Sequence, residues 1–122
     1  MDIKTVNSNL EYQVLDDRAV KLIIESGDVS LLSASVAALE GRQEQWHLGN
    51  ETKLEINLDV GNELRGRRLR SISTVADLIG GANMTRISYT LSGGSGTQNF
   101  AAELPVANEQ DIAIYRAEIK FI

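Results

Sequence analysis

The chain has 122 residues and a formal net charge of −5, which indicates one acidic domain that repels nucleic acid and anionic lipid. It has no cysteine, so disulfide scaffolds, thiol catalysis and thiolate metal sites are excluded. Aromatic residues make up only 5% of the chain, and the core must therefore be built from aliphatic side chains. No signal peptide or membrane-length apolar run is visible, so we expect a cytoplasmic protein by default.

Residues 1–9 are polar, and we expect them to form a loose lead-in. Apolar and polar residues then alternate over 10–14 and again over 20–24, which is the period of half-buried strands. Asp16-Asp17-Arg18 separates these two strands and has the composition of a turn.

Residues 29–39 fit two patterns. At helical spacing, Val29, Leu32, Val36 and Leu39 form a stripe that starts after the possible N-cap Asp28. Read as a strand, alternate residues of the same segment fall on one face. Because the neighbouring segments are predicted strands, we favour a strand and keep one short helix at 29–39 as the alternative.

The clearest strand is Lys53–Asp59, in which Leu54, Ile56 and Leu58 alternate with charged or polar residues. A turn follows at 60–62. Leu64–Asp77 is rich in β-branched residues, Ser and Thr, and we expect one long strand with a bulge near Gly66.

The last third of the chain repeats the alternation. We expect strands at 85–92 and 100–104, the second ended by Pro105, and a closing strand over Ile112–Ile122. Glycine-rich or polar segments separate them at 80–83, 93–96 and 107–111.

Seven or eight short strands with glycine-rich turns predict an all-β fold, a single antiparallel β-sandwich over residues 1–122. Immunoglobulin-like and jelly-roll connectivities both fit, and the strand order does not follow from the sequence.

Arginine side chains supply one candidate site. They offer planar, bidentate donors to a phosphate or carboxylate, so a patch of them would suit an anionic partner. The alternative is a solvated strand whose charges pair with local acids or blunt a sheet edge. The candidate residues are Arg65, Arg67, Arg68, Arg70 and Arg86.

Trp46 and His47, the single Trp and the single His, supply the other candidate, a pocket for a sugar or small ligand. A core or interface role is the alternative for each. One His and no Cys make a transition-metal site a poor fit, and we predict no metal and no cofactor.

No nucleophile–base pair or poised carboxylate pair stands out, so we assign no catalytic residue and expect no enzyme activity. Gly93-Gly94-Ser95-Gly96-Thr97 matches neither the nucleophile elbow nor the dinucleotide fingerprint. The leading hypothesis is a non-catalytic protein-interaction or structural module, and self-association through a sheet edge or face is one form of it. The alternatives are a carbohydrate-binding, lectin-like sandwich and a membrane-acting or toxin-related one.

Overall fold

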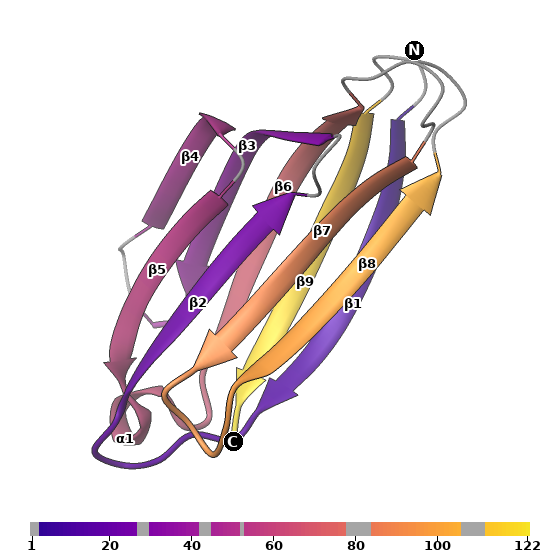
Figure 1. The fold of residues 1–122 in the computed structure, drawn as a ribbon. Coiled ribbons are helices and arrows are strands. Elements are labelled where there is room, and N and C mark those ends of the chain that lie inside the picture. The colour runs from indigo at the N-terminus through magenta and orange to yellow at the C-terminus, as the bar shows by residue number, and fades with distance from the viewer. Residues whose placement is uncertain (1–2, 27–29, 42–44, 52, 78–83, 106–111) are drawn as a thin grey trace.

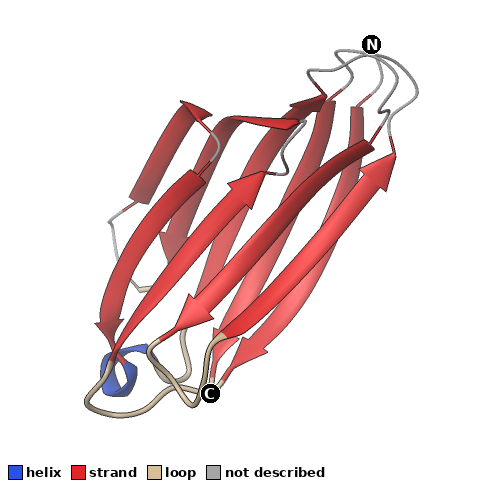
Figure 2. Cartoon of the chain, viewed as in Figure 1, coloured by secondary structure: helices blue, strands red, loops and turns tan. Residues whose placement is uncertain are grey.

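A computed structural model describes residues 3–26, 30–41, 45–51, 53–77, 84–105 and 112–122. Within these ranges the chain forms nine strands and one short helix (Figure 2). In chain order they are β1 (Ile3–Tyr12), β2 (Ala19–Ser26), β3 (Ser30–Leu39), β4 (Gln45–Glu51), β5 (Lys53–Val60), α1 (Gly61–Leu64), β6 (Arg68–Asp77), β7 (Met84–Ser92), β8 (Gln98–Pro105) and β9 (Ile112–Phe121).

The strands form two layers, as the all-β sandwich prediction requires (Figure 1). One sheet has the order β1-β9-β6-β3-β4, and the other has the order β5-β2-β7-β8. All neighbouring pairs are antiparallel except β1 and β9, which run parallel. Strands β1 and β9 therefore lie side by side, and β1 is an edge strand whose only strand neighbour within the described ranges is β9.

The core lies between the layers and follows from the alternation seen in the sequence. In β9, every second residue from Ala113 to Phe121 is buried, and in β5 the buried residues are Leu54, Ile56 and Leu58. A period of two matches the pleat of a strand with one dry face. Burial of a Leu or Ile side chain stabilises the fold by about 1.5–3 kcal/mol.

Polar side chains also enter the core, and most of them pair across strands or layers. The hydroxyls of Ser35 and Ser73 lie 2.9 Å apart, and those of Thr85 and Tyr115 lie 2.7 Å apart. Such pairs keep buried hydroxyls from being orphaned, which would cost about 1–3 kcal/mol each.

Residues 30–39 are strand β3, so the strand prediction for 29–39 is confirmed over these residues and the short-helix alternative is wrong. Tertiary pairing decides the outcome, because β3 lies between β4 and β6 and pairs with both along its length. The serine at 35 faces the core, where its hydroxyl meets Ser73. This serine on the core-facing side of β3 interrupts the alternation of apolar and polar residues that would have indicated a strand.

The prediction of one strand over Leu64–Asp77 is wrong at its beginning. Residues 61–64 form helix α1, and β6 begins only at Arg68. Gly66 has φ +86°, and its N–H donates to the Phe121 carbonyl oxygen at 2.8 Å. Glycine adopts this left-handed conformation without steric penalty, so Gly66 turns the chain into β6 rather than forming a bulge within it.

The lead-in expected over residues 1–9 is also wrong, because β1 begins at Ile3. Asn7 and Asn9 lie on its exposed face, while Val6, Ser8 and Leu10 face inward and are half-buried. Its pattern looked polar because the outer face is fully hydrated and the inner face contains a serine.

Candidate functional site

The sandwich has two sides where the sheets end, and they are built differently. On one side, β4 and β5 belong to different sheets and are separated by residue 52 alone, so the chain itself crosses from layer to layer (Figure 1). On the other side, edge strands β1 and β8 face each other without a direct connection. We call this second side the β1/β8 side.

A groove with a volume of about 310 Å³ lies on the β1/β8 side. One wall comes from Ser8 and Leu10 on β1, and the other from the segment 99–102 on β8. Tyr89, from β7, lines its floor. The groove thus opens between the two sheets, at the margin of the hydrophobic core.

The apolar residues around this groove are only partly covered by the rest of the chain. They pack against the core but stay half-buried, and they come from β1 (Val6, Leu10) and β8 (Phe100, Ala102, Leu104). Burial of the remaining apolar surface would release roughly 25 cal/mol per Å². The β1/β8 side therefore exposes apolar surface that further contacts could bury.

Strand β8 is a long edge with few of the features that normally prevent pairing. Of its eight residues only Glu103 is charged, and its carboxylate lies 3.8 Å from the Arg86 guanidinium on the neighbouring strand. Asn99 donates a hydrogen bond to the Thr90 hydroxyl at 2.7 Å, again within the sheet. Pro105 blocks a donor only at the last position. Most of the outer edge of β8 is thus open to another strand.

The opposite edge of the same sheet is charged. Strand β5 carries Lys53, Glu55 and Asp59 within eight residues. The Lys53 ammonium lies 2.9 Å from the Glu55 carboxylate, and this contact holds the pKa of Glu55 below its ordinary value. Charged side chains of this kind discourage edge-to-edge pairing.

Tyr89 and Tyr115, near the β1/β8 side, are both buried, but only the Tyr115 hydroxyl has a hydrogen-bond partner. Burial raises the pKa of Tyr89 well above its ordinary value. Its hydroxyl lies near that of Ser71 across the core, yet neither makes a hydrogen bond of normal geometry. Burial likewise raises the pKa of Tyr115, whose hydroxyl pairs with Thr85. A raised pKa keeps each phenol protonated near neutral pH, so neither is poised as a base.

Tyr12 fixes the end of β1 to the loop between β7 and β8. Its hydroxyl accepts a hydrogen bond from the Gly94 N–H at 2.7 Å and donates one to the Gly96 carbonyl oxygen. A Cβ at position 94 would lie 2.7 Å from the Tyr12 ring, so only glycine allows this approach. The two walls of the groove are thereby held together at one end.

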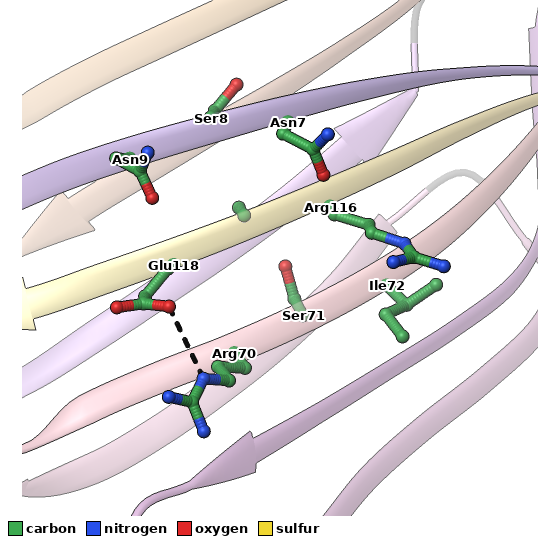
Figure 3. A pocket seen from close by; sticks show the side chains of 9 residues that line it. Asn7, Ser8, Asn9, Arg70, Ser71, Ile72, Arg116 and Glu118 are labelled. Carbon is green, nitrogen blue, oxygen red and sulfur yellow. Dashed lines mark hydrogen bonds and ion pairs between the residues drawn. The ribbon is translucent and has the colours of Figure 1, made fainter.

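A second groove, of about 260 Å³, crosses the outer face of the larger sheet (Figure 3). Asn7 and Asn9 project from β1, Arg116 and Glu118 from β9, and Ile72 from β6 (Figure 3). Ile72 is 50% exposed and lies opposite Val36 of β3 in the register, which is 37% exposed. This face mixes charged, amide and isolated apolar groups.

The five candidate arginines are distributed over separate parts of the molecule. Arg68 and Arg70 lie on the outer face of the larger sheet, where their Nε atoms are 3.2 and 3.3 Å from the two Glu118 carboxylate oxygens. Arg65 pairs with Asp16, and Arg67 donates to the Glu40 carbonyl oxygen at 3.1 Å. Arg86 lies in the other sheet. Only Arg68 and Arg70 are brought together, and both share one carboxylate.

Trp46 and His47 lie in β4, with Ala37 and Val36 as their backbone partners on β3. Their side chains lie outside the described part of the structure. The carbohydrate-binding hypothesis therefore stays a prediction. Among the described residues, no three His, Cys, Asp or Glu side chains gather as metal ligands would. In those same ranges, no helix has the length and apolar character needed to cross a membrane.

Sequence reasoning missed the β1/β8 side for two reasons. The β1 wall was hidden in residues 1–9, which were predicted to be a lead-in. The β8 wall was predicted as a strand, but its position at an edge depends on the strand order, which no local pattern gives. The one available signal was the scarcity of charge in 98–105. Comparisons with protein-family models, curated proteins and solved structures give no match for this chain.

Proposed function

We propose that this chain is a non-catalytic protein-interaction module that binds an extended polypeptide segment along the β1/β8 side. The observation that carries the proposal is the combination of half-buried apolar residues with the β8 edge, which has one charged residue in eight and, within the described ranges, no strand on its outer side. Strand addition uses both features. Main-chain hydrogen bonds to the edge supply affinity, and pockets for alternate side chains supply specificity.

The contrast with the opposite side supports this assignment. Natural sheets blunt their edges with charge, as β5 does with Lys53, Glu55 and Asp59. An edge left open on the same sheet is a liability unless a partner covers it. The groove beside β8 would accept apolar side chains from every second residue of an added strand.

Binding of a model strand tests the proposal. A capped peptide alternating Val and Thr, as long as β8 and with a lysine at each end, is titrated into isotope-labelled protein while amide chemical shifts are recorded. We expect shifts concentrated in 98–105 and in β1, because these strands line the groove. No shift at millimolar peptide, or shifts centred on β5 or on the face with Ile72, would contradict the proposal.

A matched pair of variants sharpens the test. Ala101→Lys places a charge on the exposed face of β8, and Asn57→Lys places the same charge on the exposed face of β5. Both positions lie on edge strands of one sheet. We expect Ala101→Lys to weaken peptide binding and Asn57→Lys to leave it unchanged. Equal effects would show that the peptide responds to net charge rather than to the β8 edge.

A further inference from the structure

We infer that the segment bound at the β1/β8 side is β8 of a second copy of this chain, paired antiparallel about a two-fold axis that passes through Ala102. This inference rests on the proposed function, since it names the occupant of that same edge. Strand β8 is self-complementary in that register and in neither of the adjacent ones.

A two-fold axis perpendicular to a sheet keeps each face of the sheet continuous across the pairing. Residues directly opposite each other must then come from the same face, and a shift by one residue would put inward side chains beside outward ones. Only registers centred on a residue are allowed. Near the middle of β8, the candidate centres are Ala101, Ala102 and Glu103.

The register centred on Ala102 matches apolar with apolar on the inward face. Ala102 lies opposite its own copy, and Phe100 lies opposite Leu104 of the second copy. All three residues are half-buried in the single chain and pack against its core. Pairing would therefore extend the apolar row of one molecule into that of the other, and each copy would cover the open end of the other's groove.

On the outward face, the same register places no two charged residues directly opposite each other. Glu103 lies opposite Ala101 of the second copy, and Asn99 lies opposite Pro105, where a missing N–H costs least at the end of the strand. A centre at Glu103 would set two carboxylates opposite each other, which is destabilising in a cross-strand pair. A centre at Ala101 would set Leu104 opposite Gln98 and leave an apolar residue facing a polar one.

The expected dimer is weak. An edge of eight residues is shorter than the roughly 20–30 residues that each partner contributes to a standard stable interface. The dimer is closed, because an isologous two-fold contact uses the β8 edge of both copies and leaves no β8 edge for a third. Association should thus stop at two copies and depend on concentration.

Single-cysteine variants test the register, because the natural chain has no cysteine. In Ala102→Cys the two thiols lie on directly opposed residues, whose Cα atoms are about 4.5 or 5.5 Å apart, within the range of a disulfide. In Ala101→Cys the two residues are offset by two positions along the strands, so their Cα atoms lie diagonally, roughly 8 Å apart, beyond that range. Asn57→Cys on β5 is the control for random collision.

We expect Ala102→Cys to form a disulfide dimer under mild oxidation roughly tenfold faster than either other variant, since only its thiols are held in register. Residue 102 is half-buried while 101 and 57 are exposed, so random collision would give the opposite order. Far-ultraviolet circular dichroism and gel filtration of the reduced variants establish that each one folds. Equal rates, or fastest reaction at 101 or 57, would overturn the inferred register.

Sedimentation equilibrium of the natural chain separates this inference from the proposed function. A monomer–dimer equilibrium that Ala101→Glu weakens and Asn57→Glu preserves supports the second copy as occupant, because the carboxylate introduced at 101 would lie opposite Glu103 of the other copy. A strict monomer overturns the dimer. If that monomer still binds the Val/Thr peptide along β8, the interaction module stands with another partner; if it binds no peptide there, both proposals fail.

Discussion

The β4/β5 side and the β1/β8 side of the sandwich differ in how their edge strands are connected and in how many charged side chains these strands carry. On the first, one residue carries the chain between layers and β5 is protected by three charged side chains. On the second, the edge strands β1 and β8 are not consecutive in the chain, and β8 presents seven uncharged residues out of eight. The difference shows that charged residues protect one edge of this sheet and not the other, and the unprotected side is where we propose that a partner binds.

The largest effect is expected from removing the part of β9 that holds β1, which is one wall of the β1/β8 side. Deletion of residues 117–122 takes away the part of β9 that pairs with 8–12 of β1 and with 68–71 of β6. It also removes Ile119 and Phe121, which are fully buried. We expect the truncated chain to lose its cooperative thermal unfolding transition, which circular dichroism during heating would measure.

Substitution of an exposed residue in the same strand controls for this deletion. Lys120→Ala should change the free energy of unfolding by no more than about 0.5 kcal/mol, as surface changes usually do. A truncated chain that still unfolds cooperatively would contradict the central place given to β9.

The next effect comes from the hydroxyl that ties β1 to the β7–β8 loop. Tyr12→Phe leaves the Gly94 N–H and the Gly96 carbonyl without their partner, so the free energy of unfolding should fall by about 1–3 kcal/mol. Tyr89→Phe is the matched control, because the Tyr89 hydroxyl makes no hydrogen bond of normal geometry. It should be neutral or slightly stabilising in urea unfolding. Equal losses in both variants would refute the role given to Tyr12.

Alkaline pH should weaken the fold through the tyrosines near the groove. Burial raises the pKa of Tyr89 and Tyr115 above the ordinary value of 10.0, so the unfolded chain loses these protons first. Their contribution is complete below pH 10 and declines as the pH rises further, by at most about 1.4 kcal/mol per pH unit for a fully protected tyrosine. Urea unfolding from pH 8 to 11 measures this slope. An unchanged slope in Tyr89→Phe would contradict the assignment.

The smallest effect concerns the one charge on the open edge. Glu103→Gln removes a carboxylate that each copy brings to the same interface, so self-association should tighten by a few-fold and become less sensitive to salt. Glu55→Gln makes the same change on β5 and should leave association unaltered. Weaker association in Glu103→Gln would contradict pairing along β8.

Strands with a continuous apolar row were predictable from the sequence. Both β5 and β9 have inward rows without a polar residue, and their predicted inward residues are buried. Strands with a serine in the inward row were harder. Ser8 hid β1, and Ser35 left 29–39 open to a helical interpretation. In these strands pairing with distant segments decides the structure, and that pairing has no local signature.

The candidate site was less predictable because it depends on strand order. Neither Leu10 nor Phe100 looks unusual in the sequence; they become a site when β1 and β8 fall on the same side of the sandwich. The arginines show the converse. Arg65 and Arg67 are closely spaced in the sequence and occupy the turn before β6. Arg65 pairs with the Asp16 carboxylate and Arg67 donates to the Glu40 carbonyl oxygen, away from the face that bears Arg70.

Amide hydrogen exchange at increasing protein concentration tests the difference between the two sides most directly. We predict that protection of the amides in 98–105 grows with concentration while that of the amides in 53–60 stays constant, because only the β8 edge gains hydrogen bonds on association. Concentration-independent protection along β8, or a gain along β5 of equal size, would contradict the account.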